Sequence, residues 1–266
     1  MKVVSLASGS KGNCYLVATE KTKILIDNGL SKKYLLENLE KLRISPENID
    51  AVIVSHEHSD HIKGLETFIN NYNAKIYIHN DSVTEVNKYL KNRLKNEKIF
   101  FNDDIISIKD LSIENFEVSH DSKHCCGFTI KDNNAKVSIC TDLGCINTNI
   151  LNHIKESNLV YLEANHDEKL VLDNQNYPAF LKQRILGNKG HLSNKTSSEI
   201  IGALYNSGVK QVVLSHLSEE NNSPSLAYNY IKNKILEKNI IEGEDIFIDV
   251  ASQYKMGTIF NITKKD

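Results

Sequence analysis

The stretch Ala51–Leu65, AVIVSHEHSDHIKGL, combines an apolar run with a group of residues that bind metals well. Four such residues occupy six positions directly after the run: His56, His58, Asp60 and His61. Side chains two positions apart in a strand share a face, so His56 and His58 can point toward one ion. Imidazole and carboxylate suit a borderline divalent cation, and this many ligands could serve two ions. A polar loop that caps the next helix would explain one histidine, but not three histidines and an aspartate. The sequence therefore predicts a metal site here.

Three later residues extend this predicted ligand set. His120 in FEVSHDS, Asp142 in SICTDLG and His216 in VVLSHLS each follow a short apolar run. Alone, each would be interpreted as a surface or capping residue, but together they complete a set for two ions. Asp142 is suited to bridge the ions because a carboxylate has two oxygens. We take His120 rather than His124 as the ligand because His120 ends the predicted strand.

The composition is typical of a globular protein, and the net charge gives no sign of a strongly charged partner. The 266 residues are 40% hydrophobic and include only three prolines, and no linker-like segment interrupts them. We therefore expect a single domain over residues 1–266. A formal net charge of −2 gives no global field for a polyanion, although a local basic patch would suffice for nucleic acid.

The sequence also predicts a cytoplasmic protein with no membrane association. MKVVSLASGS lacks the apolar core of a secretion signal, and no run approaches the roughly 18 apolar residues of a spanning helix. The five cysteines form no CxxC pair, so we expect reduced thiols.

Short apolar runs alternate with helical patterns, which predicts a mixed α and β fold. Strands are expected at 2–7, 14–19, 23–29, 51–55, 104–120, 125–132, 135–144, 158–165, 210–218 and 245–250. Helices are expected at 31–42, 82–96, 176–186, 196–208 and 223–239. Several strands end in ligand-type residues, and loops at strand ends are where sites are usually built.

The HxHxDH motif, followed by single His, Asp and His residues at strand ends, resembles the metallo-β-lactamase fold of binuclear hydrolases. The segments SLASGSKGNCYLV, VSHEHSDHIKGL, TDLG, LEANHD and GHLSN together resemble the YycJ/WalJ (VicX) group. Its members are bacterial cytosolic proteins regarded as DNA exonucleases, and some are encoded beside the WalK–WalR two-component system. The resemblance spans nearly the whole chain. SKHCCGF at 122–128 departs from the group, which commonly has a proline before the glycine.

This resemblance implies an αββα sandwich, two mixed sheets flanked by helices, with a two-metal site at one edge. Zinc or manganese is expected there, with iron as a further option. Asp27 in ILIDNG would lie behind the ligands and hold a ligand histidine in its tautomer, unless it only forms the turn before Asn-Gly. The implied ligands are His56, His58 and His120 for one ion and Asp60, His61 and His216 for the other, with Asp142 bridging them.

Two metal ions lower the pKa of a shared water and clamp the attacking and leaving oxygens, so the implied nucleophile is a bridging hydroxide. Such a centre could hydrolyse phosphodiesters, thioesters or lactones. Phosphodiesterases of this fold resemble one another in having an extra histidine upstream of the last ligand, which protonates the leaving alkoxide. His191 in NKGHLSN matches it, so His191 and Asp60 are the expected catalytic residues. A capping loop, with Ser193 or Thr196 as N-cap, is a compatible interpretation of the same segment.

Four further features give weaker predictions. Ser193 and Asn194 are candidates for phosphate contacts, and His166 in LEANHD is expected to line the site or brace it from behind. SGSKGN at 8–13 suits either a backbone anion nest or a tight turn. The basic segment 87–98 could follow a phosphate backbone, but a solvated helix face is favoured.

The leading interpretation is a DNA exonuclease that acts from the 5′ end on single- or double-stranded DNA, with the direction taken from the resemblance alone. A small-molecule thioester or lactone hydrolase would use the same metals but would have no need of His191. An accessory regulatory protein of the WalK–WalR system is disfavoured, because structural metal sites usually close with fewer, often Cys, ligands. The sequence does not indicate an oligomeric state.

Overall fold

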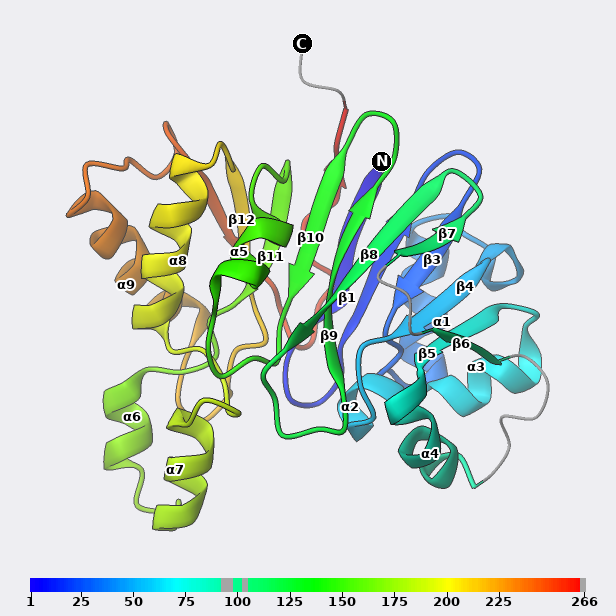
Figure 1. Ribbon diagram of the computed structural model, residues 1–266, viewed down its shortest axis with the longest axis horizontal. Helices are drawn as coiled ribbons and strands as arrows, with labels where there is room; N and C mark the ends of the chain where they lie inside the picture. Colours follow the sequence, from blue (N-terminus) through cyan, green and yellow to red (C-terminus); the bar gives the residue numbers. More distant parts are fainter. Residues whose placement is uncertain (92–97, 102–104, 264–266) are drawn as a thin grey trace.

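Two mixed β-sheets of seven strands each face one another, and helices cover the outer face of both sheets (Figure 1). This computed structural model describes residues 1–91, 98–101 and 105–263, with the backbone alone at 98–101. The αββα sandwich that the sequence predicts is thereby confirmed.

The first sheet places the ends of two neighbouring parallel strands at one edge. Its strand order is β14-β1-β2-β3-β4-β5-β6, antiparallel from β14 to β3 and parallel from β3 to β6. The side chains that follow β3 and β4 therefore emerge together, as ligand-binding residues of open α/β sheets commonly do. The strands are β1 (Lys2–Ala7), β2 (Cys14–Ala18), β3 (Lys23–Ile26), β4 (Ala51–Val54), β5 (Lys75–His79), β6 (Lys98–Phe101) and β14 (Phe260–Asn261).

The second sheet brings the ends of four strands, β8, β10, β11 and β12, to one edge. Its order is β13-β12-β11-β10-β9-β8-β7, parallel from β10 to β13 and antiparallel from β7 to β10. Because β8 and β10 are both antiparallel to β9, they run in the same direction and end at the same edge as β11 and β12. The strands are β7 (Ile105–Ile108), β8 (Leu111–Val118), β9 (Cys125–Lys131), β10 (Lys136–Cys140), β11 (Leu159–Glu163), β12 (Gln211–Ser215) and β13 (Phe247–Val250).

Three apolar clusters hold these layers together. Between the sheets, Tyr15 and Ile53 from one sheet share a core with Phe128 and Tyr161 from the other. A second cluster packs α1, α3 and α4 on the first sheet, and a third packs α5, α8 and α9 on the second. The helices are α1 (Lys32–Lys41), η1 (Pro46–Asn48), α2 (Ser59–Ile62), α3 (Leu65–Asn71), α4 (Asn80–Tyr89), α5 (Thr148–Ile154), α6 (Glu168–Asp173), α7 (Ala179–Leu186), α8 (Asn194–Asn206) and α9 (Pro224–Leu236).

Most predicted elements are confirmed, with shifted ends. The predicted strand at 23–29 stops at Ile26, because Asp27 leaves it with a φ of 60°. Helix α4 begins at Asn80 rather than at 82, and the basic segment 87–98 lies partly outside the described residues. The sequence interpretation omitted several short elements, among them β5, α3, α5 and α6, and the strand predicted at 104–120 is divided into β7 and β8. Among the described residues, no helix has the length and hydropathy needed to cross a membrane.

Candidate metal centre

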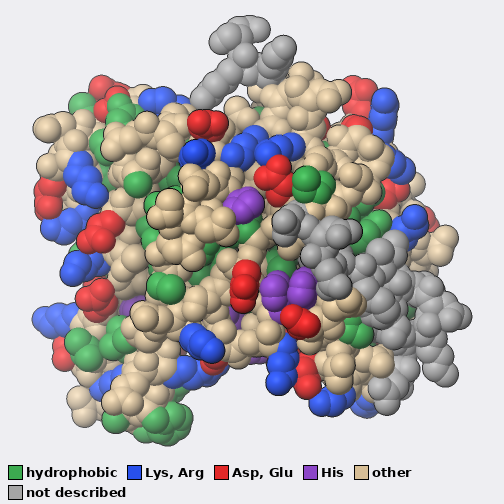
Figure 2. All heavy atoms as spheres, viewed as in Figure 1, with side chains coloured by type: hydrophobic (Ala, Val, Ile, Leu, Met, Phe, Trp, Pro, Cys, Tyr) green, Lys and Arg blue, Asp and Glu red, His purple; other side chains and the backbone are tan. Residues whose placement is uncertain are grey.

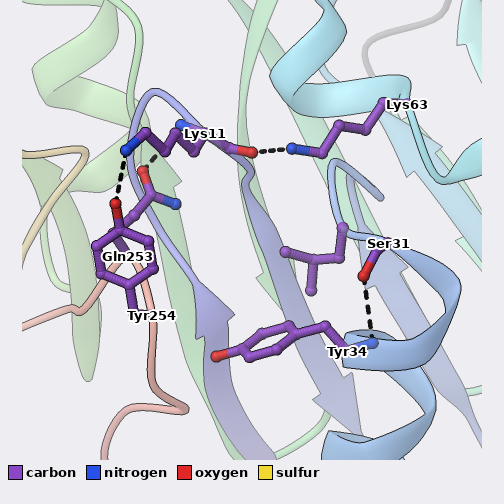
Figure 3. A pocket seen from close by; sticks show the side chains of 7 residues that line it. Lys11, Ser31, Tyr34, Lys63, Gln253 and Tyr254 are labelled. Carbon is purple, nitrogen blue, oxygen red and sulfur yellow. Dashed lines mark hydrogen bonds between the residues drawn. The ribbon is translucent and has the colours of Figure 1, made fainter.

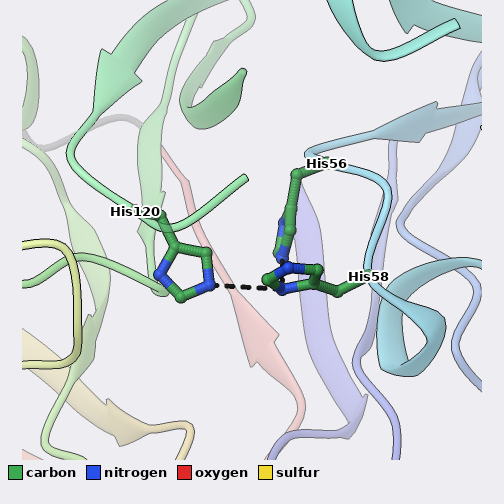
Figure 4. Close-up of side chains that lie close together, drawn as sticks. All are labelled: His56, His58 and His120. Atoms are coloured by element: carbon green, nitrogen blue, oxygen red, sulfur yellow. Dashed lines mark hydrogen bonds between the residues drawn. The ribbon is translucent and has the colours of Figure 1, made fainter. Parts of the chain in front are cut away.

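The first half of the centre is a triangle of three histidines (Figure 4). His56 follows buried strand β4, His58 is the residue before α2, and His120 lies two residues after β8. The Nδ1 atom of His58 lies 3.1 Å from Nε2 of His56 and 3.3 Å from Nε2 of His120. Ring nitrogens from two sheets thus face one point, as a single bound ion would require.

The second half is formed by Asp60, His61 and His216. Asp60 and His61 belong to the four-residue helix α2, which folds back over the end of β4. Nε2 of His61 lies 3.3 Å from Oδ2 of Asp60, and Nε2 of His216 lies 3.7 Å from the same oxygen. His61 and His216 are almost fully buried, so their ring nitrogens face the cluster rather than bulk solvent.

Asp142 lies between the two halves. Its Oδ2 is 3.3 Å from Nε2 of His61, and its Oδ1 is 3.4 Å from Nε2 of His216 and 3.9 Å from Nε2 of His120. The φ angles of Asp27, Asp142 and His216 are 60°, 59° and 55°, a left-handed conformation that is uncommon outside glycine. Backbone conformations of this kind are concentrated at functional sites, where the surrounding structure holds them.

The donor set of the cluster fits divalent cations. Oδ2 of Asp142 and Nε2 of His216 are buried, and neither makes a hydrogen bond within the described part of the chain. Burial lowers the pKa of His56 and His120, so both rings are neutral donors. Burial also opposes a charge on His61, but Asp27, Asp60 and Asp142 outweigh it and raise the pKa of His61 well above its usual value.

Asp27 supports the cluster from behind. Its Oδ2 lies 2.7 Å from Nδ1 of His61, and its two oxygens accept hydrogen bonds from the backbone N–H and the hydroxyl of Ser55 at 2.7 and 2.8 Å. With Nδ1–H directed at this carboxylate, Nε2 of His61 is left to face Asp60 and Asp142.

Glu163, which the sequence interpretation did not select, lies at the centre of a second supporting network. It ends β11 and is fully buried, and its Oε1 lies 2.8 Å from Nδ1 of His191 and 2.9 Å from Nδ1 of His216. Its Oε2 accepts the backbone N–H groups of Leu143 and Leu192, each at 3.1 Å. Burial would raise the pKa of Glu163, but His191 and His216 outweigh it and lower the pKa to about 2. Its signal in the sequence was a carboxylate that ends the apolar run LVYLE.

His191 is partly exposed and lies between two of the cluster's histidines. Its ring centroid is 5.2 Å from those of His120 and His216. The loop that carries it also contacts the first half, since Nδ1 of His120 lies 3.3 Å from the carbonyl of Gly190. A Cβ atom on Gly190 would lie only 2.2 Å from the carbonyl oxygen of Ile185, so only glycine fits at this position of the loop.

Of the three weaker candidates, Ser193 and Asn194 bond to residues other than the candidate metal ligands. The Ser193 hydroxyl caps α8 at Thr196 and donates to Glu168 at 2.8 Å, which matches the capping interpretation. The buried amide of Asn194 exchanges hydrogen bonds with that of Asn222 at 2.9 and 3.2 Å. His166 is buried, and burial lowers its pKa to about 4. Phosphate contacts by Ser193 or Asn194, and support from His166, stay predictions.

The loop 8–13 is another contributor that the sequence interpretation described only as a nest or a turn. Asn13 directs its Nδ2 at Oδ2 of Asp60 and Nε2 of His61, both at 3.1 Å, and the Ser8 hydroxyl accepts the N–H of His216 at 2.9 Å. A small pocket of about 230 Å³, lined in part by Lys11, Tyr34 and Tyr254, lies beside this loop (Figure 3).

Comparison with known proteins agrees with this geometry. Residues 7–184 match the family model of the metallo-β-lactamase superfamily. The chain is 32% identical over 240 residues to exodeoxyribonuclease YycJ of Bacillus anthracis, and 33% identical over 243 residues to exodeoxyribonuclease WalJ of Streptococcus pneumoniae strain D39. Each alignment covers 90% of both proteins. The chain therefore belongs to the metallo-β-lactamase superfamily and, within it, to the group that contains YycJ and WalJ.

Solved structures show the same fold at low identity. The metallo-β-lactamase fold protein YhfI of Bacillus subtilis matches with a TM-score of 0.70 at 17% identity, covering 97% of this chain and 98% of that one. Zn²⁺-bound PqqB of Methylobacterium extorquens matches with a TM-score of 0.73 at 13% identity, covering 98% and 100%.

Proposed function

We propose that this protein is a metal-dependent phosphodiesterase that degrades DNA from the 5′ end. The observation that carries the proposal is His191, which lies beside the metal cluster with its Nδ1 held by Glu163 at 2.8 Å. The relatives are named exodeoxyribonucleases, which supports DNA as the substrate and cleavage from a strand end as the activity. We also propose that residues 1–266 form one domain, since the two sheets share one core.

Two divalent ions, zinc or manganese with iron as a further option, would be held by the ligand sets that the sequence predicts. His56, His58 and His120 would hold one and Asp60, His61 and His216 the other, with Asp142 between them. When bound, such ions supply an activated water and neutralise charge on the phosphate oxygens. Asp60 would act as a ligand and orient the reacting groups, and Asn13 would steady its Oδ2.

The protein's own groups would control the proton positions. Asp27 would keep a proton on Nδ1 of His61 and Glu163 would do so for His216, which leaves both Nε2 atoms free to bind an ion. Glu163 would also hold Nδ1–H of His191, so that Nε2 of His191 can donate a proton to the leaving 3′ oxygen. An alkoxide is a poor leaving group at neutral pH, so this donation lowers the barrier.

The test is degradation of 5′-labelled single- and double-stranded DNA by the purified full chain with Mn²⁺, Zn²⁺ or EDTA. Wild type should release labelled mononucleotides first and only with metal, whereas His58→Ala and His191→Ala should both be deficient. His153→Ala, a half-buried histidine away from the cluster, is the matched control and should behave as wild type. No cleavage despite two bound metals would contradict the proposal and favour a thioester, a lactone or a regulatory role.

A further inference from the structure

A second group of metal-binding residues lies outside the cluster described above. His79 ends β5, Asp81 is in the first turn of α4, and His124 precedes β9. Each offers one ligand atom, and these three atoms lie within 4.8 Å of one another. Acidic and basic side chains are mixed over the face drawn in Figure 2, where histidine side chains also reach the surface.

The imidazole rings of His79 and His124 are stacked face to face. Their centroids are 3.5 Å apart and their planes differ by 10°, so a charge on both rings would be repulsive. Their side chains are only 12% and 15% exposed, whereas that of Asp81 is 68% exposed. Solvent can therefore deliver an ion at the carboxylate while the rings stay partly shielded.

The ligand atoms are close to the spacing that one ion requires. Oδ2 of Asp81 lies 3.8 Å from Nδ1 of His79 and 4.0 Å from Nδ1 of His124. Two atoms bound to one zinc at about 2.0–2.1 Å are roughly 3.4 Å apart in tetrahedral geometry. Moving Oδ2 of Asp81 about half an ångström closer to each ring nitrogen would reach this spacing. Because the lone pair of each Nδ1 lies in its ring plane, the two rings would also have to rotate out of their stack to direct both nitrogens at one ion.

We propose that His79, Asp81 and His124 form a third cation site, for a borderline transition metal such as zinc. Two imidazoles and one carboxylate suit zinc, nickel or copper better than magnesium or calcium, which prefer oxygen ligands. Three protein ligands leave at least one position for water. The Asp81 N–H donates to Nδ1 of His79 at 3.3 Å, a long hydrogen bond that a bound ion would have to displace.

This site is linked to the first cluster through Glu57, the residue between His56 and His58. Oε1 of Glu57 accepts the N–H of Lys123 at 2.7 Å, and the Ser82 hydroxyl contacts Oε2 of Glu57 at 3.2 Å and the carbonyl of His124 at 3.0 Å. A bound ion would join the start of α4 to the loop that carries His120. The third ion would thus brace one side of the metal centre without touching substrate.

The test is zinc binding by the full chain at buffered free zinc, read as zinc per chain by mass spectrometry and as affinities. His124→Phe keeps a ring stacked on His79 but removes the nitrogen, and His153→Phe is the matched control. His124→Phe should bind one zinc fewer than wild type, and the control should bind as many as wild type. Asp81→Asn, at an exposed position, should weaken the third zinc at least tenfold.

An equal zinc count and equal affinities in wild type, His124→Phe and Asp81→Asn would overturn the proposal. If His124→Phe fails to fold, the zinc affinity of Asp81→Asn tests the proposal by itself. This measurement is separate from the test of the proposed function, because it counts bound zinc and does not use DNA cleavage. His58→Ala lowers the zinc count through the first cluster, so a loss at either site can be told apart. A protein that degrades no DNA but loses one zinc on His124→Phe would refute the function and keep this site.

Discussion

Oε1 of Glu163 lies 2.8 Å from Nδ1 of His191, and the same oxygen lies 2.9 Å from Nδ1 of His216. One buried carboxylate thus orients both the candidate proton donor and a candidate metal ligand. The arrangement couples metal binding to acid catalysis, because a displacement of Glu163 would move both rings.

Replacing Glu163 by Gln should therefore affect activity and metal affinity together. The amide keeps the volume, but one of its two polar atoms becomes a donor and meets N–H groups that need an acceptor. Supporting partners of this kind typically contribute 10–100-fold, so turnover on DNA and zinc affinity should each fall by roughly that factor. Steady-state kinetics and zinc titration measure both, and unchanged turnover would rule out the positioning role.

Asp27→Asn should weaken the second half of the centre. Its carboxylate accepts from Ser55 twice and faces His61, and an amide cannot accept from all of these donors. The free energy of unfolding should fall by about 1–3 kcal/mol, the usual cost of an unsatisfied buried group. Urea unfolding of the metal-free protein measures it. The exposed Asp173→Asn is the control, and an equal effect in both variants would contradict the account.

Metal binding should release protons near neutral pH. Burial disfavours a charge on His216, but Asp142, Asp60 and Glu163 outweigh it and raise the pKa of His216 to about 10 in the metal-free protein. A metal must displace that proton, so affinity should increase with pH until about pH 10. Calorimetry at pH 7.5 in buffers of different ionisation enthalpy should show at least one proton released. A proton count of zero would mean that His216 is neutral before binding.

The same shift has a consequence for the metal-free fold. A pKa raised on folding stabilises fully below the unfolded value of about 6.5, and the contribution is lost as pH rises through the folded value. The charged His216 should therefore stabilise the metal-free protein in acid and cease to do so as pH approaches about 10.

Gly29→Ala should disturb the site through the backbone. A Cβ at Gly29 would lie 1.5 Å from the carbonyl oxygen of Asp60, whereas a Cβ at Gly257 would meet nothing closer than 3.6 Å. Overpacking of this kind costs about 1–3 kcal/mol, and moving Asp60 should also lower zinc affinity. Thermal unfolding and zinc titration should show both losses in Gly29→Ala and neither in Gly257→Ala. Equal behaviour of the two variants would contradict the close approach.

The sequence predicts the part of the site that is local. His56, His58, Asp60 and His61 lie within one strand end and the following turn, so spacing alone brings them together. The candidate ligands His120, Asp142 and His216 were predictable as strand ends, since parallel strands bring such ends to one edge.

The remaining contributors depend on how strands are ordered. Glu163 meets His216 because β11 pairs with β12 in a register that sets Glu163 opposite Ser215, which no local pattern shows. Asn13 reaches Asp60 because the loop after β1 crosses α2. His79 and His124 come from different sheets, and their stacking follows from the sandwich rather than from either segment.

The most direct test of the central claim compares two leaving groups in one metal-loaded preparation. Wild type and His191→Ala would be assayed on DNA and on bis(p-nitrophenyl) phosphate, whose phenolate leaves without a proton. The account predicts that His191→Ala loses roughly 10²–10⁴-fold on DNA and little on the aryl ester, with its metals retained. An equal loss on both substrates, or no loss on DNA, would contradict His191 as the proton donor of a phosphodiesterase.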